Sequence, residues 1–250
     1  KPVADAPVKL LATMPDSYGL LSLFGLDIDR LVSPAGAAQL SADIAGDMES
    51  YIAEGLRITS GDALTTGRIE KNAQGIRADL RTGTAHFDRW LGADMRQRLP
   101  LSLRLRADKA VARGLPLDKV ETDMKVEDGL IEVSAFKAGI WSGALTAQGK
   151  LQRGSDKSWS AETKGDLRGL RPMQIPHGIA GLSADEADMR FALSAQAKGK
   201  ESFGEVKGDI FLSMPRLTID GFDPAALAAY LDGIKGAPQD LATTAHKILR

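Results

Sequence analysis

Residues 120–136 read VETDMKVEDGLIEVSAF and contain the clearest hairpin pattern in the chain. Apolar and polar residues alternate on both sides of Asp128-Gly129, a dipeptide typical of the type I′ turn in a two-residue β-hairpin. Pairing outward from this turn gives Val126 opposite Ile131, Met124 opposite Val133, Thr122 opposite Ala135 and, on the other face, Lys125 opposite Glu132. A slip of one residue would mix the two faces, so the stretch predicts an antiparallel hairpin with one apolar and one charged face.

The same alternation recurs along much of the chain, between short turns rich in glycine and polar residues. Leu101, Leu103 and Leu105 alternate with polar residues, and residues 187–197 form the longest alternating run. Most of these strands lack the long helical connections that parallel neighbours need. The pattern predicts a mainly β protein whose sheet is an antiparallel meander.

Two further turns fix expected registers. If Gln74-Gly75 forms a two-residue turn, Ile69 lies opposite Leu80. If Ser142-Gly143 forms the next such turn, Ile140 lies opposite Leu145. Both registers place apolar residues together on one face of the sheet.

The two ends of the chain have different patterns. Residues 1–36 mix loop and helix signals, and the apolar residues Leu10 and Met14 fit either a short amphipathic helix or an edge strand. Asp223-Pro224 is typical of a helix start, with Asp at the N-cap and Pro at the first helical position. We therefore expect a loop and helical segment over residues 1–36, a β-rich body over residues 37–222 and a helical segment over residues 223–250, with a few short helices near both termini.

Composition excludes several classes of protein. The 250 residues are 43% hydrophobic and have a net charge of -1, which argues against both disorder and nucleic-acid binding. The absence of cysteine excludes disulfides, thiolate metal sites and cysteine nucleophiles. The sequence has no run of about 18 apolar residues, the length that could span a bilayer as a helix. Because the chain begins with Lys1 rather than Met, we expect it to be a processed product or an excerpt, with any anchor lying outside it.

Residues able to carry catalysis are scattered. His86, His177 and His246 are isolated from one another in the sequence. Glu186 and Asp188 would share the solvent face of a strand rather than form an acid–base pair. The sequence predicts no enzyme activity, no catalytic residues, no metal site and no cofactor.

One-sided apolar faces are the positive signal. The residues expected to line the shared apolar surface are Leu101, Leu103, Leu105, Met124, Val126, Ile131, Val133, Met189, Phe191 and Leu193. These faces can close on each other as the core of a sandwich, or remain open as a trough for acyl chains. Periodicity alone favours the closed core.

A series of turns and strands in the second half of the chain carries a family resemblance. Its parts are LDKV at 117–120, GLIEV at 129–133, AGIWSGAL at 138–145, Gly149, GDLRGLRPM at 165–173 and the stretch 208–223. Over about residues 40–235 this pattern resembles the C-terminal region of the AsmA family of bacterial envelope proteins. Trp141-Ser142-Gly143 stands where many relatives have Tyr-Gly-Gly, which keeps the aromatic residue and one glycine.

The resemblance implies a non-enzymatic periplasmic protein anchored in the inner membrane and acting in outer-membrane biogenesis. Its β-rich body would be a curved, taco-like sheet with an open apolar groove for phospholipid transport between the two membranes. The expected partners are phospholipid acyl chains and outer-membrane assembly proteins, with no nucleic acid, and membrane contact would involve segments outside this chain.

An alternative function remains open. The same faces could form a closed core without lipid, in a structural or protein-interaction module that assists outer-membrane protein assembly. Exposed strand edges would then bind a partner by strand addition. A third possibility, an envelope hydrolase, predicts a cluster of carboxylates or histidines.

Overall fold

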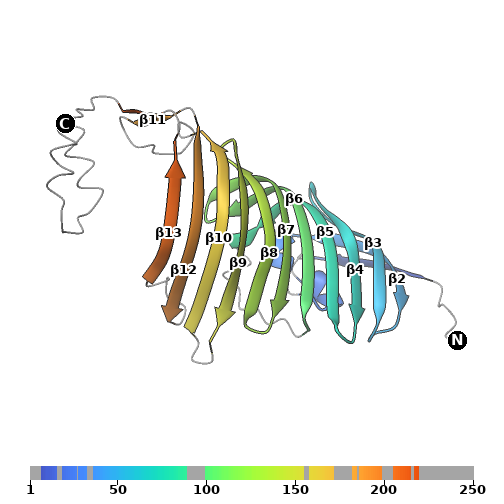
Figure 1. The fold of residues 1–250 in the computed structure, drawn as a ribbon. Coiled ribbons are helices and arrows are strands. Elements are labelled where there is room, and N and C mark those ends of the chain that lie inside the picture. The colour runs from blue at the N-terminus through green and yellow to red at the C-terminus, as the bar shows by residue number, and fades with distance from the viewer. Residues whose placement is uncertain are drawn as a thin grey trace.

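Twelve strands form a single open, curved sheet in the computed structural model (Figure 1). The structure describes residues 7–15, 19–26, 28–32, 36–88, 99–154, 158–171, 182–184, 186–198, 205–214 and 217–219. The strands of the sheet are β1 (Val8–Met14), β2 (Ala38–Gly46), β3 (Tyr51–Ser60), β4 (Ala63–Asn72), β5 (Gly75–His86), β6 (Leu101–Ala112), β7 (Leu115–Glu127), β8 (Leu130–Ile140), β9 (Gly143–Arg153), β10 (Ser158–Leu170), β12 (Ala187–Lys198) and β13 (Glu205–Ser213). The mainly β fold class is confirmed.

The strands follow one another across the sheet in chain order, as a meander requires. Neighbours among the described strands are antiparallel except β5 and β6, which are parallel. Residues 87–100 connect this pair and are numerous enough for the crossover that parallel strands need. Two short strands, β11 (Leu182–Ala184) and β14 (Leu217–Ile219), pair separately.

The hairpin of residues 120–136 has nearly the predicted register. Val126 pairs with Ile131, Met124 with Val133 and Lys125 with Glu132. Beyond Met124 the register shifts, and Thr122 lies opposite Phe136 instead of Ala135. At the turn only Gly129 has a positive φ, of 71°, so the turn is not the type I′ that the dipeptide predicted.

Two predicted turns were wrong by one residue: each turn begins one residue earlier than predicted. The partner of each strand residue therefore differs from the predicted partner by two positions. Ile69 pairs with Ala78, and Leu145 pairs with Ala138. In the first turn the Asn72 side chain accepts a hydrogen bond from the backbone N–H of Gln74 and so fixes Ala73-Gln74 as the central residues. In the second, Trp141 and Ser142 take positive φ although neither is glycine. Because the shift is even, every side chain keeps its predicted face.

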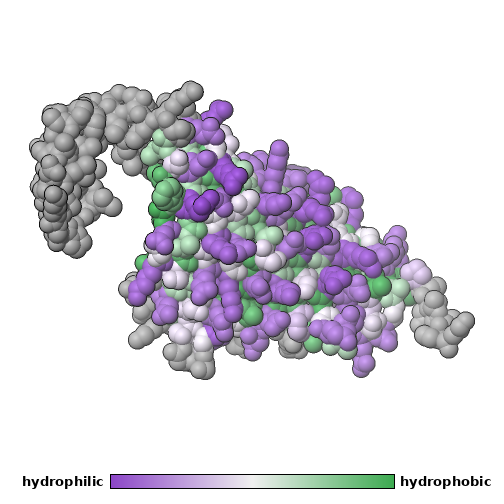
Figure 2. All heavy atoms as spheres, viewed as in Figure 1, coloured by the Kyte–Doolittle hydropathy of each residue, from purple (hydrophilic) through white to green (hydrophobic). Residues whose placement is uncertain are grey.

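The sheet has one apolar and one charged face. On β6, Leu103 and Leu105 are buried and alternate with exposed Arg104 and Arg106. We call the side that carries Leu103 the apolar face, and the side that carries Arg104 the charged face. Figure 2 shows a mostly hydrophilic surface with hydrophobic residues gathered near the β13 edge.

The N-terminal residues split between the sheet and its apolar face. β1 pairs with β2, so the edge-strand alternative for Leu10 and Met14 is the one the structure adopts. The 3-10 helix η1 (Leu21–Phe24) and the helix α1 (Asp29–Val32) follow, and the blue helical turns lie behind the sheet in Figure 1. We call residues 19–26 and 28–32 the N-terminal cover. The C-terminal helices predicted from Asp223 onward lie outside the described residues.

Candidate functional site

The structure places the predicted lining residues on the same face of the sheet. Cross-strand pairing joins Leu101, Val126 and Ile131 in one row, and joins Leu103, Met124 and Val133 in the next. Leu105 lies in a third row with Thr122 and Phe136, and the other three candidates lie on β12, in rows that continue through β9 and β10. The buried members are Leu101, Leu103, Leu105, Met124, Val126 and Ile131, and the half-buried members are Val133, Met189, Phe191 and Leu193. Their contact with a lipid stays a prediction.

The apolar face of β2–β7, which we call the closed half, is filled by the protein's own side chains. Leu20, Leu21, Leu26 and Leu31 of the N-terminal cover are fully buried and share one hydrophobic core with Ile69 of β4 and the leucines of β5 and β6. A Cβ added at Gly25 would lie 3.1 Å from Ile76 Cδ1, which shows how closely the cover approaches β5. No room for a guest is needed to complete this core.

Polar contacts fix the N-terminal cover to the strands beneath it. The Tyr51 hydroxyl donates to the Phe24 carbonyl at 2.8 Å, and the two rings lie 6.0 Å apart. The buried Thr65 hydroxyl donates to the Val32 carbonyl at 3.0 Å, with Thr82 3.0 Å away. These bonds supply donors to the Phe24 and Val32 carbonyls, and the Thr82 hydroxyl lies 3.4 Å from the Val32 carbonyl as a second donor. The cover is therefore held by directional contacts as well as by apolar packing.

The boundary of the closed half lies near β8. Phe87, at the start of the β5–β6 connection, packs edge to face against Phe136 with ring centroids 6.0 Å apart. Thr122 lies opposite Phe136, and its buried hydroxyl oxygen has no hydrogen-bond partner among the residues that the structure describes. From β9 onward the side chains on the apolar face are less buried.

The apolar face of β9, β10, β12 and β13, which we call the open half, is less covered. Most of its side chains on β9 and β12 are half-buried, and Thr163 on β10 is exposed. At one end of this half Leu167, Leu170 and Ala187 are buried and belong to the hydrophobic core. On β13, Val206 and Ile210 are each 61% exposed and Leu212 is 50% exposed. An apolar surface of this kind indicates a site that takes an apolar partner or ligand.

Small residues on β9 and β10 leave much of the backbone in the open half without large side chains above it. Ala147 and Gly149 on β9 lie opposite Gly165 and Thr163 on β10. A Cβ at Gly165 would lie 2.8 Å from Phe191 Cζ, so the missing side chain leaves space for that ring. On β9 and β10 the rows that start at Leu103 and Leu105 therefore carry only glycine, alanine or threonine.

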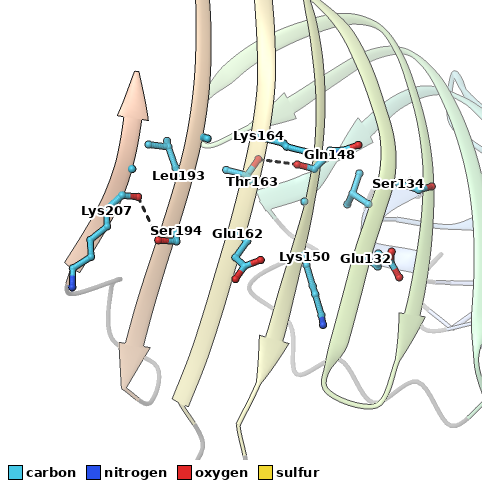
Figure 3. Close-up of a pocket in the computed structure, with 14 residues that line it drawn as sticks. Glu132, Ser134, Gln148, Lys150, Glu162, Thr163, Lys164, Leu193, Ser194 and Lys207 are labelled. Atoms are coloured by element: carbon cyan, nitrogen blue, oxygen red, sulfur yellow. Dashed lines mark hydrogen bonds between the residues drawn. The ribbon is translucent and has the colours of Figure 1, made fainter. Parts of the chain in front are cut away.

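The charged face carries two adjoining shallow hollows, of about 570 and 600 Å³, across β8–β13. Glu132, Lys150, Glu162, Ser194 and Lys207 cross the first hollow as one cross-strand row (Figure 3). Glu132, Lys150 and Glu162 alternate in sign on neighbouring strands, which stabilises their pairing, and the neutral Ser194 precedes Lys207. These hollows lie on the opposite side from the predicted apolar groove, which stays a prediction.

The described residues offer little for catalysis. Within them, no group of three or more His, Cys, Asp or Glu side chains could hold a metal ion. His177 and His246 lie outside the described part of the chain, and Asp188 accepts a hydrogen bond from the Gly169 N–H, a structural contact.

The shifted pKa values also have structural causes. Burial raises the pKa of Tyr51 to about 12. Backbone N–H groups of Ser50 and Glu49 lower the pKa of Asp47, whose carboxylate caps the β2–β3 turn. The hydrogen bond from Arg104 to Asp123, 2.7 Å long, raises the pKa of that guanidinium. None of these groups lies in the open half.

Sequence reasoning missed the N-terminal cover and the charged hollows. The run Leu20–Leu26 was noticed as apolar, but nothing in it says which strands it covers. The hollows had a detectable signal: the Lys125–Glu132 pair continues as Lys150 and Glu162 on the next strands.

Comparison with known proteins gives one match. The model of the AsmA family matches residues 60–208, a range that ends within β13. Searches of curated proteins and of solved structures return no match. In the described part of the chain, no helix is long and apolar enough to cross a membrane.

Proposed function

Because the chain belongs to the AsmA family, we propose that it is a non-enzymatic periplasmic protein that shields phospholipid acyl chains during transport between the two membranes. Family membership suggests a role in the cell envelope and in outer-membrane biogenesis. In this proposal, acyl chains lie on the open half of the apolar face. The chain itself is part of a protein anchored in the inner membrane.

The exposed apolar surface of the open half carries this proposal. Met189, Phe191 and Leu193 are half-buried, while Ile210 and Leu212 beside them on β13 are exposed. Each methylene of a guest that is removed from water contributes about 0.8 kcal/mol, so two acyl chains can be held without specific polar contacts. The rows of side chains set the width and depth of the lining.

The closed half limits where a guest can lie. Leu80, Leu103 and Leu105 already contact other apolar side chains and have almost no exposed surface. A guest placed there would have to displace the N-terminal cover and break its hydrogen bonds. We therefore assign acyl-chain binding to β9–β13, with the headgroup in water at the rim.

Lipid extraction and native mass spectrometry of the purified chain test the proposal. The wild type should retain a two-chain phospholipid, and Leu193→Glu should lose it because a carboxylate would enter the apolar lining. Ser194→Glu is the matched control, since Ser194 is the next residue and is exposed on the charged face. It should retain lipid. Circular dichroism would establish that both variants are folded.

A lipid-free wild type, or a Leu193→Glu variant that keeps its lipid, would contradict the proposal. The first result would favour the alternative, a structural module that assists outer-membrane protein assembly. The complete packing of the closed half favours that alternative, because this core needs no ligand.

A further inference from the structure

We propose that β13 is a self-association edge, through which two copies of the chain pair antiparallel and join their apolar faces into one surface. The pairing goes beyond the proposed function, since it can occur with or without a bound lipid. Its occupant is a second copy of this chain.

The two edges of the sheet differ in how they are covered. β1 likewise has a described neighbour, β2, on one side only, but its inward residues Leu10, Ala12 and Met14 pack against the hydrophobic core, and among its inward residues only Val8, at 69%, is exposed. β13 has β12 on one side and no described strand on the other. Its inward residues Val206, Ile210 and Leu212 are all half or more exposed. The N–H and C=O groups along such an edge are a template for a further strand.

Apolar rows run across the sheet and stop abruptly at β13. Ile210 lies beside Phe191, and Leu212 lies beside Met189. A strand added next to β13 would cover these side chains on their free side. On the charged face, Phe211 is 75% exposed at the end of a row that otherwise carries polar and charged residues, such as Arg190 beside it. Apolar residues therefore mark both faces of this edge.

The order of residues on β13 suits pairing with itself. A two-fold axis perpendicular to the sheet keeps both apolar faces on one side, so residues of equal parity lie opposite each other. With the axis at Gly208, Val206 of each copy lies opposite Ile210 of the other, and Lys207 lies opposite Asp209. With the axis at Asp209, two carboxylates would face each other, which is destabilising. Complementarity favours the axis at Gly208.

The contact is small. One pair of short strands buries less than the roughly 1,600 Å² of a standard stable interface, so we expect a reversible dimer that forms as concentration rises. Closed two-fold pairing stops at two copies, whereas pairing of β13 with β1 of another copy would continue into a ladder.

Sedimentation velocity over a concentration series tests the pairing with the full chain. The wild type should convert from monomer to dimer. Asp209→Lys and Lys207→Asp should each weaken the dimer at least tenfold, because each places like charges opposite each other twice. The double variant Lys207→Asp/Asp209→Lys should restore it. Leu11→Lys, at a position on β1 that is 72% exposed, is the matched edge control and should leave the dimer unchanged.

Cysteine cross-linking tests the register. The chain has no cysteine, so introduced thiols can only pair with each other. Val206→Cys/Ile210→Cys should give a covalent dimer on mild oxidation, because the two positions face each other across the axis, whereas Val206→Cys alone should not. A wild type that stays monomeric, a ladder of larger species, or a charge reversal that fails to restore the dimer would overturn the inference.

Discussion

The closed and open halves of this sheet are built from the same alternation of residues and have different surroundings. Leu103 in the closed half is 2% exposed, whereas Leu193, in the same row across the sheet, is only half-buried. In the closed half the N-terminal cover completes a dry core. In the open half the described residues leave the apolar face available. Alternation thus decides which side of a sheet is apolar, and a separate segment decides whether that side is core or surface.

The largest expected difference between the halves concerns stability. Leu105→Ala removes a fully buried side chain from the closed half and should lower the free energy of unfolding by about 2–5 kcal/mol. Leu193→Ala, the matched change in the open half, should cost less than about 1.5 kcal/mol because its side chain is already partly in water. Urea denaturation followed by circular dichroism measures both. Equal losses would mean that the open half is packed as a core.

A smaller effect is expected from the hydrogen bonds that hold the N-terminal cover. Thr65→Val removes the 3.0 Å donor to the Val32 carbonyl in a buried site and should cost about 1–2 kcal/mol. Thr163→Val is the control, because the exposed Thr163 hydroxyl donates to the Gln148 carbonyl on the open half. That change should stay within about 0.5 kcal/mol. A reversed order in urea denaturation would contradict the assignment of the two halves.

The smallest predicted effect concerns Tyr51, whose hydroxyl donates to the Phe24 carbonyl. Tyr51→Phe should cost about 1 kcal/mol at neutral pH. Since the pKa of Tyr51 is raised to about 12 in the folded protein, from 10.0, its contribution is complete below pH 10 and is lost as the pH rises through 12. The melting temperature should therefore fall more steeply between pH 9 and pH 12 for the wild type than for Tyr51→Phe. Parallel curves would show that Tyr51 does not secure the cover.

Much of the sheet could be predicted from local patterns. The hairpin around Asp128-Gly129 was recognisable because a single register separates apolar from charged residues. The side on which each predicted lining residue lies also followed from alternation. The AsmA resemblance, which rested on turns and strands between residues 117 and 223, is confirmed by the family match over residues 60–208.

Other features depend on contacts that no local pattern encodes. Turn positions were misplaced where Asn72 and the pair Trp141-Ser142, rather than a glycine, set the turn. The parallel pairing of β5 with β6 departs from the expected antiparallel meander, because alternation of residues does not encode the direction of a strand. The N-terminal cover packs on strands that lie tens of residues later in the chain, so the sequence could not say which leucines would be core and which surface.

In the proposed function, acyl chains contact the open half and not the closed half. Replacing leucine throughout the chain by a near-isosteric diazirine analogue, followed by illumination with phospholipid, measures this contact residue by residue. Mass spectrometry should locate lipid adducts at positions of the open half such as Leu145, Leu151 and Leu193, and none at Leu80, Leu103 or Leu105. Adducts at the closed-half positions, or none on the open half, would contradict the account.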